Sequence, residues 1–191
     1  MQLSHPLILA SRSPRRSALL QQIGLNPSLA PCDVPEVMDP SLSPAQNAES
    51  LAVQKARCGA KDVRDGIVLG ADTIVVIDGE TLGKPSDDAD AVRMLLLLSG
   101  RTHTVHTGFA LLECPSGRLV SGVESTRVTF RTLPREEITE YVRSGSPMDK
   151  AGAYGIQDDY GAVFVTRIEG CYYTVVGLPL ARVYQALREF V

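Results

Sequence analysis

The sequence predicts a mixed α/β fold, in which helices flank a sheet that holds both parallel and antiparallel strands. Strand and helix patterns alternate in the first part of the chain, as they do in parallel sheets. Hairpin signals follow at Asp78-Gly79 and Pro115-Ser116-Gly117, and these indicate antiparallel neighbours. The 191 residues, 44% of them hydrophobic, suffice for one globular domain over residues 1–191 with a core of normal size.

The first strand is predicted at residues 7–10 and the first helix directly after it. The run Leu7-Ile8-Leu9-Ala10 is short and apolar, as in a buried strand. Ser13 is predicted as the N-cap, with Pro14 at the first helical position and Gly24 as the C-terminal stop. An irregular crossing rich in proline is expected over residues 26–44.

A second helix is predicted to open at Ser43-Pro44, and the apolar residues 67–77 predict a buried strand. The turn at Asp78-Gly79 then leads into a short strand at residues 80–82. Residues 86–99 are predicted as a helix that faces inward with Ala89, Val92, Leu95 and Leu96. The later elements are strands at 102–113 and 119–132, a helix at 134–143, a glycine-punctuated loop at 151–157, strands at 163–168 and 172–176, and a last helix from Pro179.

Composition and charge exclude several classes of protein. The formal net charge of -3 argues against a general nucleic-acid surface, which would show a basic stripe. The longest apolar run, Met94 to Leu98, is too short to span a bilayer, and MQLSHPLILA lacks the features of a secretory signal. We therefore expect a cytoplasmic protein with no membrane and no nucleic-acid partner. The scattered Cys32, Cys58, Cys114 and Cys171 predict free thiols rather than a zinc site or a disulfide framework.

Arg15 and Arg16 stand where the first strand gives way to the first helix. Basic side chains are unfavourable in the first helical turn, because the helix dipole is positive there. Ordinary surface arginines are one interpretation. The other is an anion site, since free backbone donors and two guanidiniums together suit a phosphate group.

Asp72 is the second anomaly, because it interrupts the otherwise apolar run Val68 to Ile77. A buried carboxylate is costly unless it is paired, solvated by a cleft or bound to a metal. It either caps nearby backbone donors or serves as a metal ligand or general base. Lys55 and Lys84 are equally open to a surface role or to phosphate binding. His103 and His106 point to opposite faces of a strand and are interpreted as ordinary strand residues.

Several stretches taken together resemble the Maf family of nucleoside triphosphate pyrophosphatases. They are Leu9-Ala-Ser-Arg-Ser-Pro-Arg-Arg, Gly70-Ala-Asp-Thr-Ile-Val, Leu82-Gly-Lys-Pro, Asp149-Lys-Ala-Gly-Ala-Tyr-Gly-Ile-Gln and Val176-Gly-Leu-Pro, in the family's order over nearly the whole chain. The resemblance implies a strongly twisted mixed sheet and two lobes around a deep cleft, related in architecture to the inosine-triphosphate pyrophosphatases. It also implies hydrolysis of a nucleoside triphosphate to the monophosphate and pyrophosphate with a divalent cation, Mg²⁺ or Mn²⁺.

The resemblance assigns roles to matching residues. Asp72 would be the catalytic base and would face the metal together with Glu36. Ser11, Arg15 and Arg16 would hold the phosphates, with Lys55 and Lys84 completing the set. Arg15, Thr73 and Gln157 resemble the subfamily that acts on dTTP and UTP, and the amide of Gln157 could recognise the edge of a pyrimidine ring.

Other outcomes stay open at the level of sequence. The insertion-like Asp158-Asp159-Tyr160 departs from the family pattern and adds two carboxylates near the expected site. The rival to catalysis is a nucleotide-binding regulator of septum formation that does not turn over. A third interpretation is housekeeping hydrolysis of modified pyrimidine nucleotides. The expected partner is a small nucleoside triphosphate, and a homodimer is compatible with all three.

Overall fold

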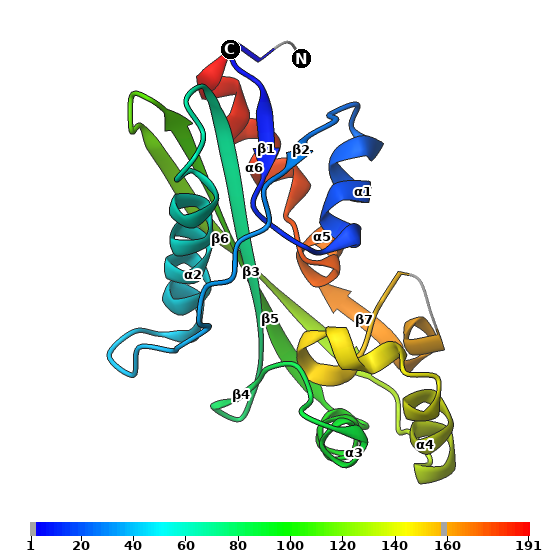
Figure 1. Ribbon diagram of the computed structural model, residues 1–191. Coiled ribbons are helices and arrows are strands. Elements are labelled where there is room, and N and C mark those ends of the chain that lie inside the picture. The colour runs from blue at the N-terminus through cyan, green and yellow to red at the C-terminus, as the bar shows by residue number, and fades with distance from the viewer. Residues whose placement is uncertain (1–2, 158–159) are drawn as a thin grey trace. The chain divides into compact units, whose positions relative to one another are not determined.

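A computed structural model describes residues 3–157 and 160–191 of the protein (Figure 1). The strands are β1 (Leu7–Leu9), β2 (Ser28–Leu29), β3 (Gly66–Ile77), β4 (Glu80–Leu82), β5 (Thr102–Cys114), β6 (Leu119–Phe130) and β7 (Val165–Glu169). The helices are α1 (Pro14–Gln22), α2 (Pro44–Gly59), α3 (Asp88–Leu98), α4 (Arg135–Arg143), α5 (Tyr172–Val176) and α6 (Leu180–Leu187), with short 3-10 turns at Ser146–Asp149, Ala151–Ala153, Tyr160–Phe164 and Arg188–Phe190.

The strands described here form a 7-stranded mixed sheet in the order β2-β1-β3-β5-β6-β7, with β4 paired to β3 outside this path. Strand β1 is parallel to β2 and to β3, whereas β3–β4 and β6–β7 are antiparallel pairs. The predicted mixed α/β class is therefore confirmed. Asp78 and Gly79 have φ values of 50° and 82°, the left-handed conformation that a tight hairpin needs between β3 and β4.

The chain divides into two compact units, and strands β3, β5 and β6 contribute residues to both. The first unit contains Met1–Asp72, Thr107–Glu124 and Gly177–Val191, and the second contains Thr73–His106 and Ser125–Val176. The cleft expected between two lobes stays a prediction.

In the first unit, helix α2 lies directly on the sheet. Ser43 and Gln46 form the capping box that starts the helix, which confirms the predicted opening at Ser43-Pro44. A Cβ atom added at Gly70 of β3 would lie 2.3 Å from the carbonyl oxygen of Ala52, and one at Gly108 of β5 would lie 2.2 Å from that of Ala48. Glycine is thus required at both positions, because the backbone of the helix occupies the space of a side chain.

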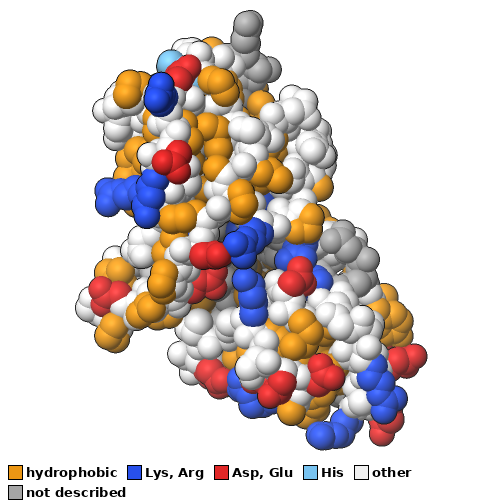
Figure 2. All heavy atoms as spheres, viewed as in Figure 1, with side chains coloured by type: hydrophobic (Ala, Val, Ile, Leu, Met, Phe, Trp, Pro, Cys, Tyr) orange, Lys and Arg blue, Asp and Glu red, His pale blue; other side chains and the backbone are white. Residues whose placement is uncertain are grey.

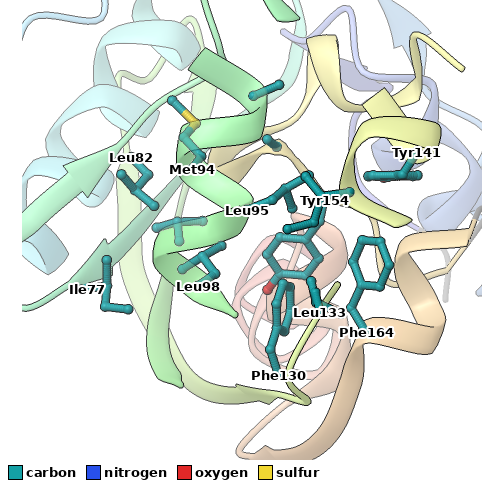
Figure 3. Packing of buried hydrophobic residues seen from close by; sticks show 14 of the residues in the cluster. Ile77, Leu82, Met94, Leu95, Leu98, Phe130, Leu133, Tyr141, Tyr154 and Phe164 are labelled. Carbon is teal, nitrogen blue, oxygen red and sulfur yellow. The ribbon is translucent and has the colours of Figure 1, made fainter. Parts of the chain in front are cut away.

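In the second unit, an apolar cluster joins β3, α3, β5, β6 and α4. Phe130 and Phe164 are fully buried in it, and the Phe130 ring meets Tyr154 edge-on with centroids 4.7 Å apart (Figure 3). Its buried members include Ile77, Leu82, Met94, Leu95, Leu98, Leu133 and Tyr141.

One sequence prediction about the helices was wrong, and another was confirmed only for the burial of Leu95. Residues 172–176 form helix α5 rather than a strand. The hydroxyl of Thr126 bonds both the N–H and the carbonyl of Cys171, and Thr174 N–H closes a helical turn on that same carbonyl. Helix α3 buries Ala91, Met94, Leu95 and Leu98, whereas Ala89 and Leu96 are exposed and Val92 is half-buried. Because Met94 to Leu98 are all apolar, their periodicity does not show which of them face the core. The N-cap at Asp87 and the packing of the helix decide which face is buried.

The expectation of four free thiols was also wrong. Cys32 and Cys58 form a disulfide with their Cα atoms 5.9 Å apart, although 26 positions separate them in the chain. Cys32 lies in the irregular crossing and Cys58 in the last turn of α2, so tertiary packing brings together two residues that their spacing could not pair. Cys114 and Cys171 are free.

Candidate active site

The start of helix α1 is organised around the hydroxyl of Ser11. Pro14 is the first helical residue and Ser13 occupies the N-cap position, as predicted, but the Ser13 side chain makes no capping hydrogen bond. Instead, Ser11 Oγ accepts hydrogen bonds from the N–H of Ser13 and from Arg16 Nη1, both at 3.1 Å. Arg16 Nε also donates to the carbonyl of Gly177, at 2.8 Å. The guanidinium is therefore held at the helix N-terminus by two separate segments of the first unit.

Asp72 ends the N-terminal segment of the first unit and is almost fully buried, with 8% of its side chain exposed. Lys55 Nζ donates a hydrogen bond to Asp72 Oδ1 and another, 2.6 Å long, to Glu36 Oε1. Lys55 itself is 11% exposed, whereas Glu36 is 46% exposed. The anomalous carboxylate of the apolar strand is thus an ion-pair partner of the lysine on α2, and Glu36 completes a triad at its outer side.

Electrostatic interactions connect the arginines with these carboxylates. Burial raises the pKa of Asp72, and the ammonium group of Lys55 opposes that rise. Burial also lowers the pKa of Arg16, while attraction to Asp72 counteracts it and repulsion from Arg15 adds to it. Asp72 and Arg16 are therefore both poorly solvated groups with a neighbour of opposite charge. Such arrangements are found most often at functional sites.

The structure brings Ser11, Arg16, Glu36, Lys55 and Asp72 into connected interactions within the first unit, and Arg15 lies beside Arg16. Basic and acidic side chains also lie next to one another on the face drawn in Figure 2.

Three other predicted site residues belong to the second unit. Thr73 is half-buried on β3, Lys84 is exposed after β4, and Gln157 is half-buried after the Ala151–Ala153 turn. Their placement relative to the first unit stays a prediction. The departure at Asp158-Asp159-Tyr160 falls largely outside the described residues, because the structure describes only Tyr160 of these three.

Glu36 and Asp72 are the candidate metal ligands. Across residues 3–157 and 160–191, no group of three or more His, Cys, Asp or Glu side chains is arranged to hold a metal ion. Two carboxylates that converge on one ammonium group nevertheless fit Mg²⁺, which proteins commonly bind through one or two carboxylates while substrate phosphates and water supply the rest. No helix in the described part of the chain is long and apolar enough to cross a membrane.

Sequence reasoning missed two contributors to this site. Gly177 supplies its carbonyl to Arg16 from far along the chain, although it lies in a stretch that carried the family resemblance. Gly70 allows the backbone of α2 to pack directly against β3. The sequence did contain a signal for this contact, because a glycine inside a strand often marks a place where another backbone comes close.

Comparison with known proteins identifies the family. The Maf-like protein family matches residues 6–190. A dTTP/UTP pyrophosphatase of Chlorobium phaeovibrioides is 50% identical over 188 residues, covering 96% of each chain. Proteins of the same description from Salinibacter ruber, 50% identical over 98% of this chain and 92% of that protein, and from Bacillus cereus, 48% identical over 96% and 95%, are also similar.

The fold and the site thus define an α/β protein with a buried, cation-paired carboxylate beside an arginine-bearing helix N-terminus. The chain belongs to the Maf-like protein family.

Proposed function

We propose that this protein hydrolyses dTTP and UTP to the nucleoside monophosphate and pyrophosphate. The observation that carries the proposal is the buried Asp72 carboxylate, ion-paired with Lys55 and electrostatically coupled to Arg16. Relatives about half identical over nearly their full length bear the description dTTP/UTP pyrophosphatase, which supports this substrate class.

Asp72 is proposed as the base that accepts a proton from the attacking water. The water oxygen forms a bond to the α-phosphorus, and the bond from that phosphorus to the oxygen bridging the α and β phosphates breaks, which releases pyrophosphate. Lys55 opposes the rise in the pKa of Asp72 that burial causes, and so favours the ionised form, which can accept the proton.

Arg15, Arg16 and Lys84 are proposed to offset the negative charge that develops on the departing pyrophosphate. Charged groups positioned before the reaction usually supply the largest catalytic contribution, because they need not reorganise as the charge develops. The hydrogen bonds from Arg16 to Ser11 and Gly177 hold its guanidinium group in place before the reaction. This explains why two basic residues occupy a helix start, where they are unfavourable for the helix itself.

Glu36 and Asp72 would hold the divalent cation, Mg²⁺ or Mn²⁺. When bound, it would neutralise phosphate charge and orient the triphosphate. Lys55 lies between the two carboxylates in the protein alone and keeps these like charges together before substrate arrives.

Thr73, Gln157 and Arg15 are proposed to select the base, with the donor and acceptor of the Gln157 amide facing the pyrimidine edge. We further propose a cytoplasmic location and nucleotide-pool housekeeping as the role, on canonical or modified pyrimidine nucleotides. The rival function, a nucleotide-binding regulator of septum formation, would need no base, and the pairing of Asp72 with Lys55 favours catalysis over it.

The test is product analysis with purified protein and dTTP, UTP, CTP and GTP in the presence of Mg²⁺. We expect pyrophosphate and the monophosphate, a preference for dTTP and UTP, and loss of turnover when a chelator is added. Asp72→Asn should lower kcat by roughly 10²–10⁴-fold, the usual contribution of a general base, while nucleotide binding persists.

Three results would contradict the proposal. Release of single phosphates as the main product would exclude cleavage between the α and β phosphates. A loss below about tenfold in Asp72→Asn would assign the base elsewhere. Tight nucleotide binding without any turnover would favour the regulatory function.

A further inference from the structure

The segment from Lys150 to Gln157 contains one residue, Ala153, in a backbone conformation that a residue with a side chain does not favour. Gly152 and Ala153 both have positive φ, at 72° and 61°. Ala153 is fully buried, and a residue with a side chain adopts this left-handed region only at a cost. Strain of this kind persists where the surroundings impose it, and it is concentrated at functional sites.

The strained turn is tied to the segment that carries Lys84. Gly152 N–H donates a 3.0 Å hydrogen bond to the carbonyl of Gly83, the residue before Lys84. A Cβ atom added at Gly152 would lie 3.1 Å from both γ-methyl groups of Val75 on β3. The turn is therefore packed against β3 and linked to the backbone next to a proposed phosphate-binding residue.

Buried hydroxyl groups hold the residues that follow. The Tyr154 hydroxyl and His103 Nε2 on β5 form a 2.8 Å hydrogen bond, and both side chains are buried. The hydroxyl of Tyr141 on α4 accepts the N–H of Gly155, at 3.3 Å. Figure 3 shows Tyr154 among the aromatic side chains of this core, with Phe130 and Phe164 beside it.

We propose that Tyr154, with its partners His103 and Tyr141, is a positioning residue that determines which base the enzyme prefers. The bonds from residues 152–155 reach the Lys84 segment, β5 and α4, so the turn is fixed from three sides before the chain arrives at Gln157. The hydroxyl groups would thereby set the direction of the Gln157 amide and fix its position relative to Lys84. This inference rests on the proposed function.

The experiment compares Tyr154→Phe with the wild type. The substitution keeps the ring that packs on Phe130 but removes the hydroxyl. Two quantities are measured: kcat/KM for UTP and GTP, and the Kd of their non-hydrolysable α,β-imido analogues. We expect the UTP-over-GTP preference to fall roughly fivefold or more in both, because small displacements of a positioning group have large effects. Tyr184→Phe, at an exposed tyrosine of α6 in the first unit, is the matched control and should leave the preference unchanged.

Further variants separate positioning from mere stability. His103→Gln, whose amide can still bond Tyr154, should retain most of the preference. His103→Leu combined with Tyr154→Phe leaves neither polar group of the pair unpaired and should recover stability relative to Tyr154→Phe alone, but not the preference. Should Tyr154→Phe fail to fold, Tyr141→Phe tests the same turn through Gly155 and is expected to lower the preference.

A preference that is unchanged in Tyr154→Phe, or that recovers together with stability in the double variant, would overturn the inference. So would a wild type that does not discriminate between the UTP and GTP analogues. A wild type that discriminates in binding but releases no pyrophosphate would refute the proposed function alone, since the Kd ratios would still decide the role of Tyr154.

Discussion

His103 shows how a single residue acquires its properties from its surroundings. It was interpreted as an ordinary strand residue that points away from the face of His106, and it is 2% exposed whereas His106 is half-buried. Burial lowers the pKa of His103 to about 4, from a usual value of 6.5. Its Nδ1 atom has no hydrogen-bond partner among the described residues, so nothing there compensates a positive charge on the ring.

This residue should make the protein sensitive to acid. The unfolded chain binds a proton at His103 near pH 6.5 and the folded chain only near pH 4, so the unfolded state binds more protons between these values. The free energy of unfolding should therefore fall as the pH drops through this window, with His103 contributing about 2–3 kcal/mol of the loss by pH 4.5. Urea unfolding at pH 7 and pH 4.5 should show a smaller loss in His103→Gln, and equal losses in both proteins would exclude His103 as the cause.

At the scale of elements, the site depends on how closely helix α2 approaches strand β3. Lys55 is on the helix and Asp72 is on the strand, and their ion pair lies beside the glycine contacts between the two backbones. A Cβ atom at Gly70 would lie 2.5 Å from the backbone nitrogen of Ala56, the residue after Lys55. Because backbone cannot rotate away as a side chain can, a larger residue would have to shift the helix.

Gly70→Ala should thus separate Lys55 from Asp72 and reduce both stability and activity. Forcing extra volume into a packed contact typically costs about 1–3 kcal/mol of unfolding free energy, and kcat/KM should fall by more than tenfold. Gly122→Ala on β6 is the control, since its Cβ would meet side chains rather than backbone: the Phe109 ring at 3.0 Å and Arg182 Nη2 at 3.5 Å. Thermal unfolding and steady-state kinetics on both variants would show whether the loss of activity is specific to Gly70.

At the scale of the whole molecule, the Cys32–Cys58 disulfide joins the irregular crossing to the end of α2. Glu36 is four residues after Cys32, and Lys55 is three residues before Cys58. The covalent link therefore closes the segment that contains the Glu36–Lys55 ion pair. In a reducing compartment the same fold would have to hold this segment without it.

Removal of the disulfide should lower the free energy of unfolding by about 3.5 kcal/mol, the chain-entropy value for a loop of this length. Cys32→Ser, or reduction of the wild type with dithiothreitol, should produce this loss in denaturant unfolding. Cys171→Ser serves as the control because Cys171 is a free thiol. Reductant should lower the stability of this variant as much as it lowers that of the wild type. Identical unfolding of the oxidised and reduced wild type would show that the link contributes nothing.

The sequence by itself determined features that depend on neighbours a few positions apart. The start of α2 at Ser43-Pro44, the position of Pro14 at the start of α1 and the turn at Asp78-Gly79 all lie where their local patterns predicted. Asp72 could be singled out for a related reason, since a carboxylate in an apolar strand is unusual whatever surrounds it.

Only the tertiary structure decided the partners of these residues. The pairing of Asp72 with Lys55, the support of Arg16 by Gly177, the disulfide and the bond between His103 and Tyr154 each join positions far apart in the chain. The helix at Tyr172–Val176 also arose in this way, because a threonine of another strand satisfied the backbone of Cys171. Local pattern reports the conformation that a segment prefers, whereas the packing of distant segments decides which charges and hydrogen-bonding groups meet.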